Sequence, residues 1–283
     1  MYCGAKPVEN KQGIRKEPPK VGLPPVKTFT VNGVSFNMIL VEGGSFYYGL
    51  DADTYKKETL EGKDYKRIHP LVTVQSFYIG ETQVTQALWE AVMENKDPLL
   101  PFEKKPIFNP SSFKGKNLPL DFGDGQHGPS MSDKVMVGFF ERLNDLTSEE
   151  FRLPGDGEWE FAAKGGNKSK GYKYAGSDNI DDVAWYVENS GNKKERHSRF
   201  WSYCGKTHDV KTKMPNELGI YDMCGNVAEY VGLYGIYNLS HCDARFRGGG
   251  WRSPCDECII VYDNNKNSSE NCGFRLALSI KRQ

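Results

Sequence analysis

Most apolar residues in the second half of this chain lie in short runs separated by glycine, and this pattern limits what the chain can fold into. Examples are YKYAGS, PNELGIYDMCGNVAEYV, RFRGGGW and CGFRLALS. Glycine permits tight turns and close backbone approach, but it weakens strand and helix interiors. A doubly wound sheet would need a long alternation of strands and helices, which this half does not show. The pattern predicts short strands joined by loops.

The first half adds a hairpin and two helices. Asn32-Gly33 interrupts an alternating apolar segment and is typical of a hairpin turn. Thr85 and Ser132 are suitable N-caps for the two helices. The apolar stripes of these helices are Leu88, Trp89, Val92 and Met93 in the first, and Met136, Phe139, Phe140 and Leu143 in the second. We therefore expect an α+β domain with two helices, short-stranded mixed sheets and long loops.

The overall charge and hydropathy exclude some classes of partner. Lysines and arginines number 37, as do the acidic residues, so the formal net charge is zero. A balanced chain is not drawn to nucleic acid by a general electrostatic field, and we expect no nucleic-acid partner. No apolar run approaches the roughly 18–20 residues that span a bilayer.

The first 28 residues are too polar and too rich in Lys, Pro and Gly to fold alone. We expect residues 1–28 to be a disordered tether and residues 29–283 to form the domain. Cys3 precedes Gly4 at the start of the tether, as the acylated cysteine does in a bacterial lipoprotein. One hypothesis is lipidation of Cys3, which would place the protein on the cell surface, anchored in the outer membrane; the other is a leader with an incidental cysteine.

Six motifs along the chain resemble one known family. In order they are VEGGSFYYG, FYIGETQVTQALWEAV, FRLPGDGEWEFAAKGG, PNELGIYDMCGNVAEY, RGGGW and CGFRLAL. They are similar to the formylglycine-generating, or sulfatase-modifying, family over about residues 30–280. The resemblance implies a variant C-type lectin fold, in which we expect Arg152, Arg247 and Arg275 to join loops through fork-shaped hydrogen bonds. The candidate partners of these arginines are Asp222, Glu158 and Glu229.

Two branches of this family have different functions. Members of one branch oxidise a substrate cysteine to formylglycine, using two cysteines that hold copper. Members of the other are variable proteins of diversity-generating retroelements, treponemal variable lipoproteins among them, in which the fold displays a hypervariable ligand-binding surface. The chain resembles the second branch more closely, and LPGDGEWE stands where the family usually has LPTEAEWE.

The positions of the copper cysteines argue against the oxidase. In that branch the two cysteines follow the glycine-aromatic motif, with four residues between them. Counted from Gly248-Gly249, these positions are Ser253 and Cys258. A serine oxygen is a poor substitute for the soft thiolate that Cu(I) prefers, and only two residues separate Cys255 from Cys258. We expect no enzymatic activity and no cofactor, with the copper-dependent formylglycine-generating oxidase as the alternative.

The resemblance also implies a way to recognise a diversified segment. Retroelements randomise adenines, typically in Asn codons, and the resulting codons cannot encode Lys, Glu, Gln, Met or Trp. The residues between Arg252 and Cys272 come mainly from the permitted set, with Glu257, Lys266 and Glu270 as exceptions. We therefore predict a variable region over about residues 237–272; the alternative is an ordinary polar loop.

The predicted contact surface faces an unknown protein or glycan, and we expect the protein to be a monomer. Cys258, Val261 and Tyr262 are expected to face inward. The predicted contact residues are Tyr237, Leu239, His241, Asp243, Arg252, Ser253, Asp256, Ile260, Asp263, Asn264, Asn265, Asn267, Ser268, Ser269 and Asn271.

A zinc site is a third hypothesis. Its candidate ligands are His241, Cys242, Cys255, Cys258 and Cys272. A Cys-x-x-Cys pair is typical of zinc sites, but the spacing to a second pair does not match a standard arrangement. We expect no metal at this position.

Overall fold

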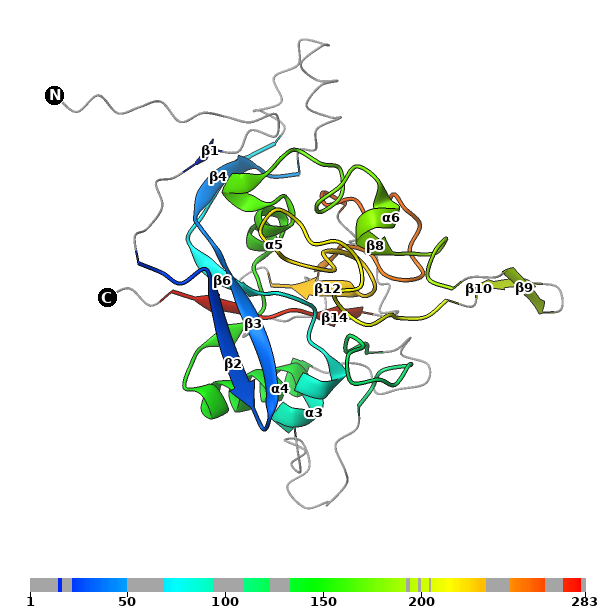
Figure 1. Ribbon diagram of the computed structural model, residues 1–283, viewed down its shortest axis with the longest axis horizontal. Coiled ribbons are helices and arrows are strands. Elements are labelled where there is room, and N and C mark those ends of the chain that lie inside the picture. The colour runs from blue at the N-terminus through cyan, green and yellow to red at the C-terminus, as the bar shows by residue number, and fades with distance from the viewer. Residues whose placement is uncertain are drawn as a thin grey trace, which may run out of the picture.

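The computed structural model describes residues 15–16, 22–49, 69–93, 109–122, 133–191, 194–197, 200–203, 205–232, 245–262 and 272–280. These residues form a mixed α+β domain of several small sheets and a few short helices (Figure 1). The predicted fold class is confirmed. No helix within these ranges has the length and apolar character of a membrane span.

The largest sheet in the described part of the chain has five strands in the order β2-β3-β6-β15-β7. Neighbouring strands in this sheet pair antiparallel. The predicted hairpin joins its first two strands, with Asn32 and Gly33 at φ values of 46° and 83°. The strands are β2 (Val26–Val31), β3 (Val34–Val41), β6 (Phe77–Gly80), β7 (Phe151–Arg152) and β15 (Ala277–Ser279).

Both faces of this sheet are covered, because successive residues of a strand point to opposite sides. Ile39 and Val41 of β3 join the core that includes α5 (Asp156–Ala163). Met38 joins the core that includes α3 (Gln86–Met93) and α4 (Asp133–Thr147). The central strands are therefore apolar at consecutive positions.

Helices α3 and α4 bury the predicted stripes. The ring centroids of Trp89 and Phe139 are stacked 5.1 Å apart across the contact between the two helices. Thr85 caps α3 as predicted, since its Oγ1 accepts a hydrogen bond from the Leu88 amide at 3.2 Å. Ser132, the predicted cap of α4, lies outside the described residues.

The other sheets in the described part of the chain have two or three strands each. Strand β12 (Ala228–Val231) lies between β13 (Arg245–Arg247) and β14 (Cys272–Phe274), and β4 (Gly44–Tyr47) lies between β1 and β5. The remaining elements are β1 (Arg15–Lys16), β5 (Leu71–Val74), η1 (Gly166–Lys168), α6 (Ile180–Val183), β8 (Ala184–Trp185), β9 (Lys194–His197), β10 (Phe200–Tyr203) and β11 (Cys224–Gly225).

Two of the described strands begin within the segment predicted as a tether. Strand β2 begins at Val26, ahead of the predicted start at residue 29, because its first residues pair with Ile39 and Met38. Arg15 and Lys16 form β1 and pair with β4 rather than belonging to an unstructured segment. Cys3 lies outside the described residues.

Candidate ligand-binding face

The segment between Arg247 and Gly273, which holds most of the predicted variable region, begins and ends beside one strand. On β12, Glu229 is paired with Arg247 of antiparallel β13 and with Gly273 of parallel β14. The two ends of this segment are thus neighbours across a single strand, although 26 positions separate 247 from 273. This sheet fixes where the segment begins and where it ends.

Glu229 is also the centre of a buried charge network. Its carboxylate accepts two hydrogen bonds from Arg275, each of 2.6 Å, and one from Trp159 Nε1 at 2.7 Å. Gln83 Nε2 donates to the same carboxylate at 3.1 Å and to the Val227 carbonyl at 2.8 Å. We call these groups the Glu229 network. A fork-shaped pair with its remaining donors satisfied is the arrangement in which a buried charge is tolerated.

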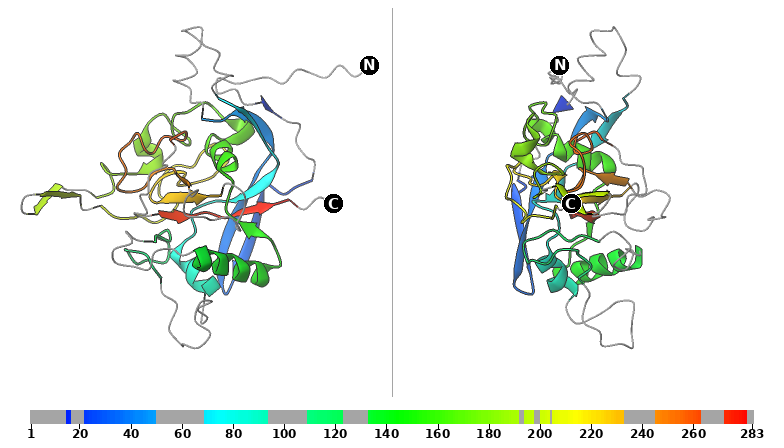
Figure 2. Two further views of the ribbon diagram at one scale, coloured as in Figure 1. Left: turned by 180° about the vertical axis from the view of Figure 1, so that it is seen from behind. Right: turned by 90° about the vertical axis from the view of Figure 1, so that its right-hand side faces the viewer.

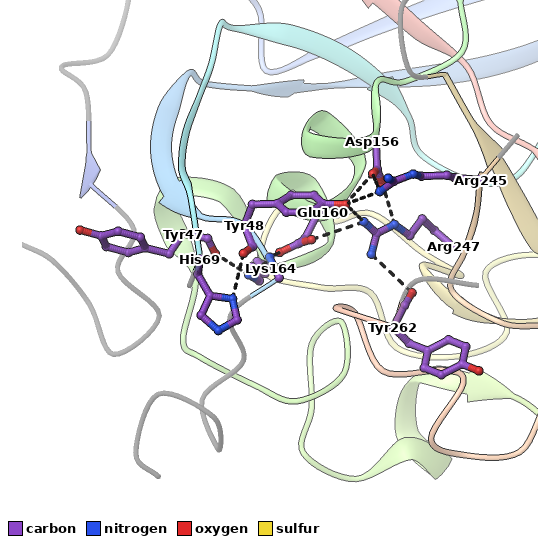
Figure 3. Close-up of polar contacts among 10 residues, drawn as sticks. Tyr47, Tyr48, His69, Asp156, Glu160, Lys164, Arg245, Arg247 and Tyr262 are labelled. Carbon is purple, nitrogen blue, oxygen red and sulfur yellow. Dashed lines mark hydrogen bonds and ion pairs between the residues drawn. The ribbon is translucent and has the colours of Figure 1, made fainter. Parts of the chain in front are cut away.

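A second buried network surrounds Asp156, at the start of α5 (Figure 3). Arg247 Nε donates to Asp156 Oδ1 at 2.6 Å, and Arg245 Nη1 donates to Oδ2 at 2.9 Å. The Tyr48 hydroxyl donates to Oδ2 at 2.5 Å and accepts hydrogen bonds from both arginines. Burial alone would raise the pKa of Asp156, but its hydrogen bond to Arg247 and the charge of Arg247 lower that pKa below its usual value. Asp156 therefore stays ionised and holds β13 against α5 and the end of β4.

The Asp156 network continues into α5. Arg247 Nη2 lies 3.7 Å from Glu160 Oε2, and Glu160 Oε1 accepts from Lys164 Nζ at 2.6 Å. Arg247 also donates to the Tyr262 carbonyl at 3.4 Å (Figure 3). One buried arginine thus connects β13 with Tyr262, a residue 15 positions further along the chain.

The turn that follows Trp251 contains the exposed residues of the predicted contact surface. We call Arg252 to Glu257 the 252–257 face. Its start is fixed by the backbone: the Trp251 amide donates to the Asn226 carbonyl at 2.9 Å, and the Ser253 carbonyl accepts from the Val187 amide at 3.1 Å. Gly249 has a φ of +66°, and a Cβ added there would lie 2.8 Å from Cys258 Sγ, so the tight turn requires glycine.

The predicted contact residues of this turn divide by exposure. Arg252 and Asp256 are exposed and Ser253 is half-buried. Ile260 is only 2% exposed and packs into the core that includes α5, so its assignment to the contact surface is wrong. Of the residues expected to face inward, Cys258 is fully buried, whereas Val261 and Tyr262 are half-buried.

The other predicted site residues lie outside the described residues, and their assignment stays a prediction. They are Tyr237, Leu239, His241, Asp243, Asp263, Asn264, Asn265, Asn267, Ser268, Ser269 and Asn271.

The two positions that correspond to the copper cysteines both lie against Gly249. Ser253 Cβ is 3.2 Å and Cys258 Sγ is 2.8 Å from the position that a Cβ of Gly249 would take. The Ser253 hydroxyl accepts a hydrogen bond from the Gly250 amide at 3.1 Å, and burial raises the pKa of the Cys258 thiol well above its usual value. One hard oxygen and one protonated thiol do not fit Cu(I), which prefers two thiolates.

The zinc hypothesis gains no support from the described residues. Within these ranges, His, Cys, Asp and Glu form no group of three or more that could hold a metal ion. Cys255 is exposed, while Cys258 and Cys272 are buried. The other two candidate ligands, His241 and Cys242, lie outside the described residues.

The sequence predicted the charged residues of the Glu229 network better than those of the Asp156 network. It named three arginines and three candidate partners without assigning pairs; Arg275 pairs with Glu229 and Arg152 with Glu158, whereas the Asp222 carboxylate accepts from the Lys211 amide. It missed Asp156 as the partner of Arg247. The available signal was the Arg-Phe-Arg sequence of β13, because residues two apart on a strand point to the same side, and a buried cation beside a half-buried one requires an acid.

The fold and the placement of these motifs define the class of protein. Residues 26–280 match the family model described as the Sulfatase-modifying factor enzyme 1-like domain, and the chain belongs to this family.

Similar solved structures share the fold. Treponema denticola variable protein 1 is 26% identical, with a TM-score of 0.62, and the match covers 90% of this chain and 99% of that protein. PvdO from Pseudomonas aeruginosa is 20% identical, with a TM-score of 0.59, over 92% of this chain and all of that chain. The second likeness shows the fold alone.

Relatives identified by sequence differ in architecture. The chaperone protein LppX of Paenibacillus barcinonensis is 30% identical over 276 residues, which cover 85% of this chain and 88% of LppX. The serine/threonine-protein kinase Pkn1 of Chlamydia trachomatis is 29% identical over 148 residues, or 46% of this chain. The match spans only 21% of that kinase, so the kinase is much longer than the segment it shares with this chain.

Proposed function

We propose that the protein is a ligand-binding member of this family and that the 252–257 face is part of its contact surface. The observation that carries the proposal is the contrast between this exposed turn and its buried borders. Arg247 and Trp251 on one side and Arg275 on the other are at most 2% exposed, whereas Arg252 and Asp256 are exposed. The likeness to Treponema denticola variable protein 1 supports the same conclusion.

The full contact surface would extend over the variable region at about residues 237–272 and would bind a protein or a glycan. Exposed loops on a rigid scaffold accept substitutions because they bury little. Retroelement diversification would produce the variation. It predicts a nearly identical template sequence near the gene, with adenines at the positions that differ; sequencing of the locus would reveal its presence or absence.

The proposal places the protein on the cell surface, lipid-anchored in the outer membrane through Cys3. Metabolic labelling with an alkyne fatty acid tests the anchor. We expect label on the wild type and none on Cys3→Ser; equal labelling of both would reject Cys3 as the attachment site.

The contact surface is tested by array binding. The labelled protein would be applied to arrays of glycans and purified surface proteins, next to Arg252→Ala/Asp256→Ala. We expect this variant to lose the wild-type signals, whereas Lys116→Ala/Glu150→Ala, with both changes at exposed positions outside the face, retains them. Signals that survive in the first variant would exclude the 252–257 face.

The alternative function, copper-dependent oxidation of a substrate cysteine, has a separate test. The reduced protein would be titrated with Cu(I) against a chromogenic chelator and then incubated with a cysteine-containing sulfatase peptide in oxygen. We expect neither stoichiometric copper nor aldehyde, because the donors are Ser253 and a buried Cys258. Tight copper binding with aldehyde product would replace the binding proposal with the oxidase.

A further inference from the structure

A cleft that the proposed function does not use lies between the β2–β3 hairpin and the start of α3. It has a volume of about 320 Å³ and is lined by β3, by the connection between β6 and α3, and by the loop at Val210 and Lys211. Small-ligand sites typically measure roughly 300–1,000 Å³. In the right-hand view of Figure 2, the blue β2–β3 hairpin lies at one edge of the molecule, away from the orange segment that carries the 252–257 face.

The charged groups along this cleft compensate each other. Glu81 Oε1 accepts from Lys211 Nζ at 2.9 Å, and Glu81 Oε2 accepts from Asn37 Nδ2 at 3.0 Å. A charged ligand would have to compete with the Glu81–Lys211 ion pair for either partner. A neutral ligand can add hydrogen bonds to the ammonium and amide groups without breaking the pair.

The lining also contains polar groups that lack partners. The backbone amides of Thr82 and Gln83 make no hydrogen bond to the described residues, whereas the Thr82 hydroxyl donates to the Gln83 carbonyl at 2.9 Å and Gln83 Nε2 donates into the Glu229 network. The Thr82 and Gln83 amides can therefore donate to a ligand in the cleft, and the carboxylate of Glu81, which lines the same cleft, can accept from it.

A hydroxyl is the group that both donates and accepts through one atom. Apolar side chains such as Val34, Leu88 and Leu276 line the same cleft and can contact the carbon skeleton of a ligand. We propose that this cleft is a second ligand site, separate from the 252–257 face, which binds a neutral, hydroxyl-rich molecule of the size of a monosaccharide.

The test uses amide chemical shifts. The ¹⁵N-labelled protein would be titrated with D-glucose, D-galactose, D-mannose and N-acetyl-D-glucosamine, and with the charged sugars D-glucuronate and D-glucosamine. We expect at least one neutral sugar to shift the Thr82 and Gln83 amides in a saturable way. We expect Lys211→Met to weaken that sugar at least tenfold, and Lys206→Met, an exposed lysine of the same loop outside the cleft, to leave it unchanged.

Three results would overturn the proposal: no shift of these two amides with any neutral sugar, equal affinity in Lys211→Met, or preferential binding of a charged sugar. The variant Arg252→Ala/Asp256→Ala separates this site from the proposed function. Sugar binding should be unchanged in that variant, and its loss would place the sugar on the 252–257 face. Failure of the cleft to bind a sugar leaves the array result unaffected.

Discussion

Asp222 is a buried carboxylic acid whose protonation should influence stability. Its Oδ2 accepts a hydrogen bond from the Lys211 amide at 2.9 Å, and burial raises the pKa of the carboxyl to about 6. In the unfolded chain this pKa is near 3.8. The folded state therefore holds the proton more tightly, and the group stabilises the fold most at low pH.

The raised pKa of Asp222 in the folded state gives a pH-dependent prediction for Asp222→Asn. As the pH rises from about 4 through about 6, the wild type should lose stability relative to the variant, because only the wild type must bury a charge. The difference should reach on the order of 2–3 kcal/mol above pH 6. Urea denaturation at pH 4.5 and pH 8 measures it, with Asp209→Asn at an exposed position as the control; an equal difference at both pH values would contradict the assignment.

Ser253 stands at the position where members of the oxidase branch have the first of their two copper-binding cysteines. Since Ser253 and Cys258 lie against the same glycine, Ser253→Cys should place a second thiol beside Cys258. We expect this variant to compete for one Cu(I) per chain where the wild type does not. The double variant Ser253→Cys/Cys258→Ser is the control, and copper binding equal to that of Ser253→Cys would show that the metal is held elsewhere.

At the scale of elements, the Glu229 network joins β12 to the residue that follows β14. Replacing Arg275 with Met would leave Glu229 buried without its fork-shaped partner. Loss of one partner of a buried pair costs about 3–5 kcal/mol. We expect a decrease of that size in the free energy of unfolding, measured by urea denaturation, and partial recovery in Arg275→Met/Glu229→Gln. A decrease below 1 kcal/mol would mean that the pair adds little to stability.

The elements with a clear periodicity of apolar residues were predictable from the sequence, and the pairings between distant elements were not. The stripes of α3 and α4 and the Asn32-Gly33 turn follow from local spacing and turn chemistry. The contact of Arg245 with Asp156 depends on how β13 is placed against α5, which local spacing does not specify. The assignment of Ile260 to the contact surface was wrong because it rested on which residues diversified Asn codons can encode. Codon content does not specify burial, which depends on the path of the turn after Trp251.

At the scale of the whole molecule, the protein combines the buried Glu229 and Asp156 networks with the 252–257 face, a turn that contributes little to the core. Replacing Arg252, Pro254 and Asp256 together with Ala should lower the free energy of unfolding by less than about 1.5 kcal/mol, because surface substitutions usually cost under about 0.5 kcal/mol each. Ile260→Ala should lower the free energy of unfolding by about 2–5 kcal/mol, since it removes buried side-chain volume. Thermal melts compare the two variants. Equal losses of stability would contradict the contrast between the buried core and the exposed turn.

The pairing of Arg247 and Gly273 with the same residue, Glu229, has a consequence for length as well as for sequence. A segment whose two ends are already adjacent is closed like a ring, and the entropic cost of closing a flexible ring grows only with the logarithm of its size. Doubling the number of residues would cost only about 0.6 kcal/mol. Insertions between these anchors that leave the buried Trp251, Cys258 and Ile260 in place should therefore be accommodated at low cost to the fold, which makes the domain a suitable carrier for foreign peptides.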